Sequence, residues 1–321
     1  MLAANSALVS AQEFNKSNEE ICQSPPIRLI VPYTAGGVTD VIARSLSEKL
    51  SRELKQSVVV DNRAGAGATI GLEYLSRSPA NGCTFAFSAI SPLTLSPHIM
   101  SLGFDPINDV VPIASVMYSP IYVLGTKSLK VSTFESMIKL AQDNPGTVSV
   151  ATSGYGSLGH LMVELIQQKA FTKLNHVPYK GSGGQSVADA LSGQFDVLLV
   201  NPTSAINNLI DQGRFNLLAV GSIGRLKAYP NVKTLAEYGF SQANVVSEFG
   251  IFAPSKTSSK VVQRMSQLIN RLLENPELSS QIANSQNVIL QSSSKDFSKK
   301  IFTEYLKNQK LSKSIGLKAS E

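Results

Sequence analysis

The chain has 321 residues, of which 43% are hydrophobic and 16% charged, and it carries a formal net charge of +6. This length allows two domains with a substantial buried core, and the composition argues against disorder. No apolar run approaches the roughly 20 residues that a bilayer-spanning helix needs. The densest basic segment lies near the C-terminus at helical spacing, interleaved with Asp296 and Glu304. We interpret it as a solvated face that attracts anions, and we expect no nucleic-acid partner.

The N-terminal segment, residues 1–24, predicts a signal-peptide remnant followed by a polar leader. MLAANSALVSAQ is apolar and contains the small-residue pattern Val9-Ser10-Ala11, although it lacks a basic n-region. Cys22 and Cys83 fit either one disulfide in an oxidising compartment or two unrelated buried thiols. The three histidines are scattered and show no metal-binding spacing, so we expect no metal site.

From residue 26 onward, β-like runs alternate with amphipathic helical runs. In the first predicted helix, apolar residues recur every four positions from Val38 to Leu54, which gives one apolar face. Alternation at this spacing predicts parallel sheets with helices on both faces. The predicted strands are residues 27–33, 57–61, 83–89, 147–151, 175–178, 195–200 and 216–221, and the predicted helices are residues 38–54, 69–76, 133–142, 158–170, 185–191, 205–212, 260–273 and 295–308.

Two further β-rich stretches, residues 113–126 and 245–254, have no helix within them. We interpret both as crossings between two domains. The first domain is then discontinuous, and the second is inserted into it. The predicted boundaries are residues 25–118 plus 246–321 for the first and 119–245 for the second. Ligands in such folds bind at the carboxyl ends of strands, in the cleft between the domains.

The loop PYTAGG, residues 32–37, joins the first predicted strand to the first helix. Gly36 and Gly37 allow the backbone to approach a ligand closely, and the helix that follows offers unpaired N–H groups. This pattern predicts a site for a carboxylate or a phosphate. Asp40 falls in the first helical turn, where a negative charge is favourable in itself. Its pattern therefore fits either a helix-start acid or a ligand contact.

A second glycine loop, ATSGYGSLGH at residues 151–160, contains G-x-G-x-x-G between a predicted strand and a predicted helix. This is the context of a dinucleotide fingerprint. A dinucleotide fold also places an acid about 20 residues further on, and that region reads TKLNHVPYKG, without one. The other glycine run, AGAGATIG at residues 64–71, has the wrong spacing and predicts tight packing of strand against helix. A nucleotide-cofactor enzyme therefore stays only as an alternative.

Catalytic constellations are not evident in the sequence. There is no G-x-S-x-G elbow, and Cys83 has no obvious paired base. His160 stands alone on the helix that follows the glycine loop, and a lone histidine of this kind is more often structural than catalytic. The sequence therefore favours a binding protein over an enzyme, with no cofactor.

Nine motifs occur in an order that resembles one family: PIRLIVPYTAGGVTDVIAR, VVVDNRAGAGATIG, SPANGCTFAF, FDPINDVVPIA, ATSGYGSLGHL, HVPYKGSG, NPTSA, LAVGSIGR and FGIFAP. Over residues 25–309 the chain resembles the solute-binding proteins of tripartite tricarboxylate transporters, the Bug family. The resemblance implies a type II periplasmic-binding-protein-like α/β fold, in which two lobes with mostly parallel sheets flank a ligand cleft. It also implies a monomeric periplasmic receptor that hands a di- or tricarboxylate, an amino acid or an aromatic acid to a membrane permease. A sensor for a signalling partner is the alternative.

In this family, two loops on opposite lobes grip the ligand through amides, hydroxyls and water. Carried onto this sequence residue by residue, the resemblance implies two groups of ligand-binding residues. From the first lobe these are Tyr33, Thr34, Ala35, Gly36, Gly37, Asp40, Ser88 and Ala89. From the second they are Ser153, Gly154, Tyr155, Gly156, Ser157, His160 and Asn201, with Tyr179, Lys180, Gly181 and Ser182 as a rim.

The sequence departs from the family pattern at two places that bear on the ligand. Val200 stands where the family often has an acid, and Glu248 stands where an aromatic residue is common. Both changes can alter the polarity of the pocket. In the implied fold, Cys83 opens the strand beside the first strand, and Cys22 lies just before that first strand. The resemblance therefore implies a disulfide between Cys22 and Cys83.

Overall fold

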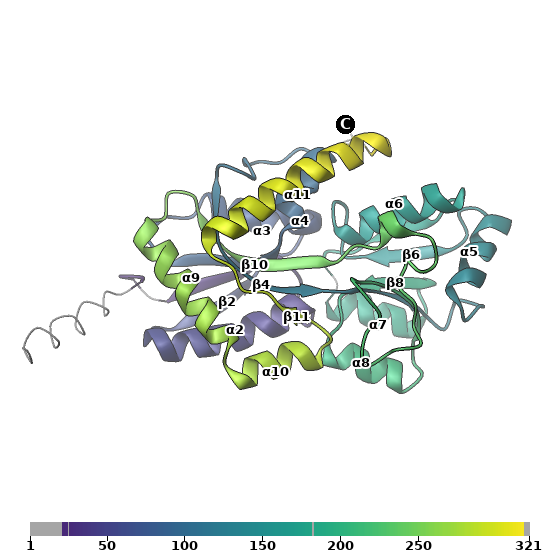
Figure 1. The fold of residues 1–321 in the computed structure, drawn as a ribbon, viewed down its shortest axis with the longest axis horizontal. Coiled ribbons are helices and arrows are strands. Elements are labelled where there is room, and N and C mark those ends of the chain that lie inside the picture. The colour runs from purple at the N-terminus through teal and green to yellow at the C-terminus, as the bar shows by residue number, and fades with distance from the viewer. Residues whose placement is uncertain (1–20, 25, 182, 318–321) are drawn as a thin grey trace, which may run out of the picture.

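The computed structural model of the protein describes residues 21–24, 26–181 and 183–317 and contains two α/β lobes, each built on one sheet (Figure 1). Lobe 1 holds the sheet with strand order β11-β4-β10-β3-β1-β2, and lobe 2 holds the sheet β7-β6-β8-β5-β9. The predicted two-lobed α/β architecture is therefore confirmed. Among the described helices, none is long and apolar enough to cross a membrane.

Lobe 1 is formed by both ends of the described chain. Its strands are β1 (Ile27–Val31), β2 (Val58–Asn62), β3 (Thr84–Ala89), β4 (Val110–Ser119), β10 (Ser247–Pro254) and β11 (Val288–Ile289). Its helical segments are α2 (Val38–Leu54), η1 (Ala66–Ala68), α3 (Thr69–Ser76), α4 (Ser91–Thr94), η2 (Ser96–His98), α9 (Ser259–Leu273), α10 (Pro276–Asn284) and α11 (Ser294–Ser314).

Lobe 2 is formed by the middle of the chain. Its strands are β5 (Ile121–Gly125), β6 (Ser149–Thr152), β7 (Asn175–Pro178), β8 (Val197–Val200) and β9 (Asn216–Gly221). Its helical segments are α5 (Phe134–Asp143), α6 (Leu158–Ala170), α7 (Gly184–Ser192), α8 (Ser204–Asp211) and η3 (Ser241–Ala243).

The expectation of mostly parallel sheets is confirmed by the strand directions, because four of the six strands in lobe 1 and four of the five in lobe 2 run the same way. In lobe 1, β10 runs antiparallel to both β3 and β4, and β11 runs antiparallel to β4. In lobe 2, β5 runs antiparallel to β8 and β9. The exceptions β5 and β10 are the strands that directly follow the two crossings between the lobes.

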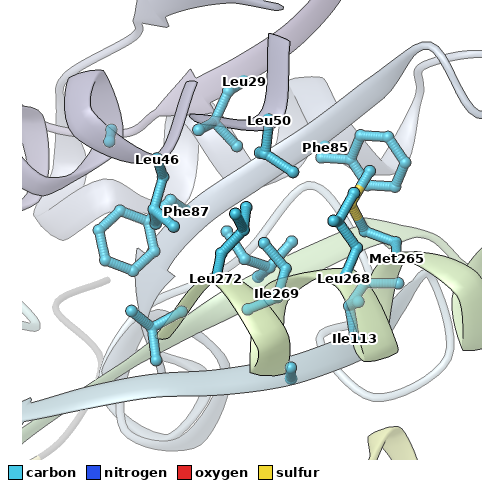
Figure 2. Packing of buried hydrophobic residues seen from close by; sticks show 14 of the residues in the cluster. Leu29, Leu46, Leu50, Phe85, Phe87, Ile113, Met265, Leu268, Ile269 and Leu272 are labelled. Atoms are coloured by element: carbon cyan, nitrogen blue, oxygen red, sulfur yellow. The ribbon is translucent and has the colours of Figure 1, made fainter. Parts of the chain in front are cut away.

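The core of lobe 1 shows why the apolar periodicity predicts its helices. Leu46 and Leu50 of α2 pack on one face of the sheet with Ile269 and Leu272 of α9 (Figure 2). The opposite face is covered by α3, α4 and α11, with Phe297 fully buried. Helices on both faces leave the ends of the strands as the accessible edge of the sheet, and binding residues gather there in such folds.

Helix α11 belongs to lobe 1 at its start and reaches lobe 2 at its end. Phe297 and Ile301 lie in the lobe 1 core, whereas Leu311 and Ile315 pack against the core of lobe 2. Figure 1 shows the helix crossing from one lobe towards α6 of the other. The two lobes are thus joined by α11 as well as by the two strand crossings.

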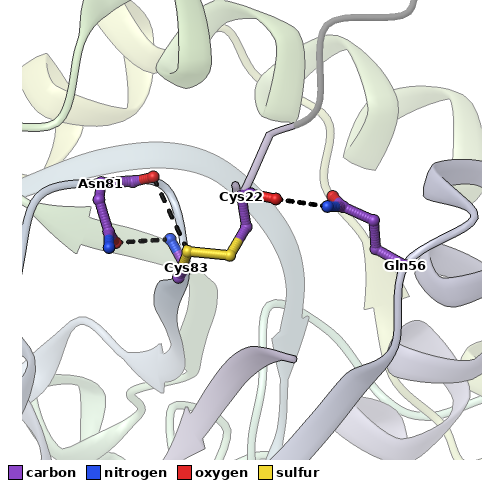
Figure 3. The surroundings of a disulfide bond; sticks show 4 residues. All are labelled: Cys22, Gln56, Asn81 and Cys83. Atoms are coloured by element: carbon purple, nitrogen blue, oxygen red, sulfur yellow. Dashed lines mark hydrogen bonds between the residues drawn. A yellow bond between two sulfur atoms is a disulfide. The ribbon is translucent and has the colours of Figure 1, made fainter. Parts of the chain in front are cut away.

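A disulfide ties the start of the described chain to lobe 1 (Figure 3). Cys22 is bonded to Cys83, with 4.7 Å between their Cα atoms and 61 positions between them in sequence. The Asn81 side chain accepts a hydrogen bond from the Cys83 amide at 3.1 Å. This is the pairing that the family resemblance implied.

Candidate functional site

A small cavity of about 30 Å³ lies between the two lobes, where the carboxyl ends of β1, β3, β6 and β8 meet. We call it the first cavity. A volume of this size holds about two water molecules, so a larger ligand requires the lobes to move apart. It is lined by Tyr33, Gly37, Val38, Thr39, Gly67, Ala89, Ser91, Ile121, Ser153, Ser157, Leu158, Gly159, Leu199, Val200, Asn201, Ser247 and Phe249.

Two long helices begin at the first cavity, one from each lobe. The 17-residue α2 starts there with Val38 and Thr39, and its N-cap residue Gly37 supplies no side-chain cap. The 13-residue α6 starts there with Leu158 and Gly159, after the cap Ser157. Helix N-termini carry unpaired amides and a partial positive charge. The first cavity is therefore built to attract an anion from both sides.

Charged side chains are absent from the described wall of the first cavity. Its polar groups are hydroxyls, the Asn201 amide and backbone atoms, and the remaining wall is apolar, with Ile121, Leu199 and Phe249 among its members. An anion held here is bound by dipoles rather than by ion pairs. An ammonium group finds no carboxylate among these residues to neutralise it.

The lobe 1 loop, residues 32–37, is held by the buried carboxylate of Asp40. The Gly36 amide donates to one Asp40 oxygen at 3.0 Å, and Asn62 donates to the other at 3.0 Å. Arg44 completes the set with two hydrogen bonds at 3.1 and 2.9 Å. Burial disfavours the charged form, but these hydrogen bonds outweigh it and keep the pKa of Asp40 below its usual value. The carboxylate therefore positions the loop from behind.

The lobe 2 loop, residues 153–157, rests on a neutral aromatic stack. The His160 ring stacks on Tyr155 and on His176, with ring centroids 4.2 and 4.7 Å away. The Gly156 amide donates to His160 Nδ1 at 3.4 Å, and His176 Nε2 lies 2.7 Å from Thr152 Oγ1. Burial, reinforced by His176, lowers the pKa of His160 to about 4. Both rings are therefore uncharged at neutral pH.

Each of the two loops contacts segments of the opposite lobe across the cleft. The Gly184 amide of lobe 2 donates to the Ala35 carbonyl at 3.1 Å, and Ser96 Oγ donates to the Gly156 carbonyl at 3.3 Å. Gly67 approaches so closely that a Cβ atom built there would lie 2.2 Å from the Tyr155 carbonyl oxygen. Glycine is needed at Gly67 for this approach, and its φ of +61° also favours glycine.

Tyr33 and Asn201 connect the cavity wall to the strands behind it. Burial raises the pKa of Tyr33 to about 12, although hydrogen bonds with Ser88 and the Ala89 backbone oppose this shift. The Asn201 side-chain amide donates to the Pro120 carbonyl at 2.9 Å and to Ser247 Oγ at 3.1 Å. Asn201 thus bridges the two segments by which the chain crosses between the lobes.

The structure distributes the sequence-predicted ligand residues over three environments. Six line the first cavity: Tyr33, Gly37, Ala89, Ser153, Ser157 and Asn201. Seven lie at contacts between the lobes: Thr34, Ala35, Gly36, Gly154, Tyr155, Gly156 and Gly181. Asp40, Ser88, His160 and Tyr179 make contacts within their own lobes, Lys180 is exposed, and Ser182 lies outside the described residues.

Several lining residues were missed by reading the sequence. Ile121, Ser247 and Phe249 lie on the strands that cross between the lobes, and pairing between distant strands brings them to the cavity. Gly67 lies in the run that was interpreted as a packing turn. Its close approach to Tyr155 depends on how the lobes meet, which leaves no local signal. Thr39 could have been predicted, because it lies two residues after the predicted glycine loop.

Comparisons with known proteins agree with one another. Residues 42–317 match the family model described as tripartite tricarboxylate transporter family receptor. The chain is 35% identical over 251 residues to Protein BugT of Bordetella pertussis, covering 78% of this chain and 76% of that protein. A solved structure titled as a periplasmic transporter is 30% identical, with a TM-score of 0.86 and coverage of 91% and 97%. The structure of R. palustris Rpa4515 with adipate is 27% identical, with a TM-score of 0.86 and coverage of 93% and 99%.

Proposed function

The chain belongs to the tripartite tricarboxylate transporter receptors, and from this premise we propose that it binds a small organic acid in the first cavity. The observation that carries the proposal is the meeting of two helix N-termini, α2 and α6, at one cavity with no charged side chain in its described wall. Amides at helix N-termini bind carboxylates without a counter-ion. The adipate in the related Rpa4515 structure is an acid of this kind.

The same wall restricts the class of acid. A carboxylate is stabilised at the helix N-termini, whereas an ammonium group placed there meets the positive ends of both dipoles. Val200, which stands where the family often has an acid, leaves no charge at the end of β8 to compensate. The ligand of this chain is therefore an organic acid without an amino group.

The proposal extends to how the protein works. The units that close on the ligand are residues 25–118 plus 246–321 and residues 119–245, and the ligand is released unchanged to a membrane permease. Within the described residues, no group of three or more acidic, histidine or cysteine side chains is placed to hold a metal ion. A receptor role needs neither a metal nor a cofactor.

The periplasm is the proposed location. The Cys22–Cys83 disulfide supports it, because disulfides persist in the oxidising periplasm and are rare in the cytosol. Cell fractionation of the expressed full chain, followed by thiol labelling with and without reductant, tests this. We expect the protein in the periplasmic fraction with no labelled thiol until reduction. Two free thiols in a cytoplasmic fraction would overturn the location.

A thermal-shift screen tests the ligand class. The panel contains dicarboxylates, tricarboxylates, aromatic acids and amino acids, together with NAD and NADP. A ligand that binds only the folded protein stabilises it by about 2.7 kcal/mol at a concentration of 100 Kd. We expect a rise in Tm with one or more amine-free acids and none with the amino acids or nucleotides. Stabilisation by a nucleotide and by no small acid would overturn the receptor role.

A further inference from the structure

A second cavity of about 400 Å³ lies beneath α11, next to the first cavity. Its roof is α11, and its other walls come from α4, the start of α6 and residues 241–248. Ser91 and Leu158 line both cavities, so they form the wall between the two. The second cavity therefore adjoins the ligand site on the side of α11.

The wall of the second cavity combines apolar side chains with hydroxyl, amide and charged groups, and three of its charged residues lie on α11. Leu161, Val246 and Leu311 are among the apolar members. On α11, Glu304 lies 3.3 Å from Lys300 and 3.5 Å from Lys307, so these charges largely satisfy one another.

Glu248 is the remaining charged residue of this wall. Its carboxylate accepts a hydrogen bond from Ser115 Oγ at 3.1 Å. The four charged side chains comprise two lysines and two glutamates. The second cavity therefore has no net charge to attract an ion, and its apolar side chains offer contacts to a hydrocarbon.

We propose that the second cavity receives the tail of the ligand. The carboxylate lies in the first cavity, and an unbranched apolar tail passes Ser91 and Leu158 into the second cavity, which we also call the tail chamber. This inference rests on the proposed function, because it needs the carboxylate to be held at α2 and α6. It assigns an acid with an extended hydrocarbon tail as the substrate class.

Volume supports the division of the ligand between two chambers. The first cavity, at about 30 Å³, has little room beyond a carboxylate, whereas the second offers about 400 Å³. Each methylene buried in an apolar chamber strengthens binding by about fourfold. Affinity is therefore expected to rise with chain length until the tail fills the chamber.

Calorimetric titration with a length series tests the proposal. The probes are the straight-chain monocarboxylates from propanoate to octanoate, with the α,ω-dicarboxylates of the same lengths as a second arm. For the wild type we expect affinity to rise about two- to fourfold per added methylene, and more steeply for the monocarboxylates. A flat or falling series, or a larger gain for the dicarboxylates, would overturn the apolar tail chamber.

Val246→Phe tests whether the tail of the ligand lies in the second cavity. Val246 is half-buried, lines the second cavity and does not line the first. The larger ring is expected to abolish the gain from long tails while leaving the Kd of propanoate within about twofold. Val288→Phe is the matched control, because Val288 lies on β11 outside both cavities. An undiminished length dependence in Val246→Phe would contradict the assignment.

Two outcomes separate this inference from the function on which it rests. If no acid of any length binds the wild type, the proposed function fails. If short acids bind and longer tails add nothing, the function stands and the tail chamber is wrong. Should Val246→Phe also lose short acids, Leu311→Trp fills the same chamber from α11 on the opposite wall. Retention of the long-tail gain in that variant would also overturn the assignment.

Discussion

The two loops that face each other across the cleft expose amides to the same cavity, but they are supported in different ways. Behind the lobe 1 loop, the support is a buried charge, because the Asp40 carboxylate accepts hydrogen bonds from the Gly36 amide, Arg44 and Asn62. Behind the lobe 2 loop, the support is the neutral stack of Tyr155 and His160. The charged support persists across the neutral range because the pKa of Asp40 is held below its usual value, whereas the neutral support depends on unprotonated imidazoles.

This difference follows from where each charge lies relative to the bound anion. Asp40 is 4% exposed, and its carboxylate accepts hydrogen bonds from donors on its own lobe. These donors compensate its negative charge, so the charge has little effect on an anion in the cavity. His160 is 1% exposed and lies directly beneath its loop. A neutral ring there lets the Gly156 amide donate inwards while the helix N-terminus faces the ligand. The two lobes therefore offer similar amide surfaces to the ligand, but their supports respond differently to pH.

The largest expected effect comes from blocking the contact between Gly67 of lobe 1 and the lobe 2 loop. In Gly67→Ala, the new methyl group collides with the Tyr155 carbonyl, 2.2 Å from the built Cβ position. We expect the closed state to become rare, so that ligand affinity falls at least about 100-fold, or about 2.7 kcal/mol. Calorimetric titration with the best acid from the screen measures the loss.

A matched variant separates this collision from backbone strain. Gly213 has a φ of +68°, close to the +61° of Gly67, and no atom lies within 4 Å of its built Cβ. Gly213→Ala therefore carries the same left-handed penalty of about 1–2 kcal/mol without the collision. We expect it to lower Tm and to keep the affinity. Equal affinity in both variants would show that closure does not bring Gly67 against the lobe 2 loop as in this structure.

The regular elements of both lobes are largely predictable from local patterns. The periodicity from Val38 to Leu54 marks α2 with the bounds that the structure gives, and the same holds for α6. Helix α10 escaped prediction, because its nine residues carry only two buried apolar side chains, Leu278 and Ile282. Antiparallel pairing of β10 with β3 was also out of reach, since it joins residues more than 150 positions apart.

The sequence predicts site residues only where the local pattern itself marks them. Glycine loops before helices identify Gly37 and Ser157, because the signal and the function occupy the same residues. Ile121 and Ser247 reach the cavity through tertiary packing, so their local sequence predicts only strands. For Asp40, the sequence allowed either a helix-start acid or a ligand contact. The structure directs its carboxylate to the loop backbone, a partner that becomes visible only when the turn is folded.

Loss of the charge behind the lobe 1 loop is expected to have the second largest effect. In Asp40→Asn, one of the two acceptor oxygens becomes an amide that faces the donors of Arg44 or Asn62. Charge-assisted hydrogen bonds contribute about 1.5–3 kcal/mol, so we expect a loss of about 2 kcal/mol in the free energy of unfolding at pH 7. Chemical denaturation followed by circular dichroism measures it, and ligand affinity should also weaken.

Asp143→Asn provides the comparison for Asp40→Asn. Asp143 also pairs with a cation four residues away on its helix, Lys139, but both side chains are exposed. Exposed pairs of this kind contribute at most about 0.5 kcal/mol. If the two substitutions lower the free energy of unfolding equally, the carboxylate of Asp40 does not organise its loop. The proposed contrast between a charged and a neutral support would then be wrong.

The smallest expected effect, and the one that separates the two supports, is pH dependence. Unfolded histidine takes up a proton near pH 6.5, whereas burial lowers the pKa of His160 to about 4. The unfolded chain therefore binds more protons in this window, and stability falls as the pH falls from about 6.5 to about 4. His176, whose pKa burial also lowers, acts in the same direction. Glu164, whose pKa burial raises, opposes the loss towards the acidic end.

Between pH 7 and pH 5.5 the His160 contribution amounts to about 1 kcal/mol. Asp40 adds nothing in this interval, because its pKa is held below its usual acidic value. In His160→Asn, the side-chain oxygen can still accept from the Gly156 amide but cannot titrate, so the slope of stability against pH should decrease. Ligand affinity should not depend on His160 over this interval, because the folded ring takes up a proton only near pH 4. His98, whose pKa burial also lowers, bonds the Tyr305 carbonyl away from the loop, so His98→Asn should reduce the slope without affecting the loop. If His160→Asn leaves the slope of stability against pH unchanged, His160 is not a buried neutral ring beneath the lobe 2 loop.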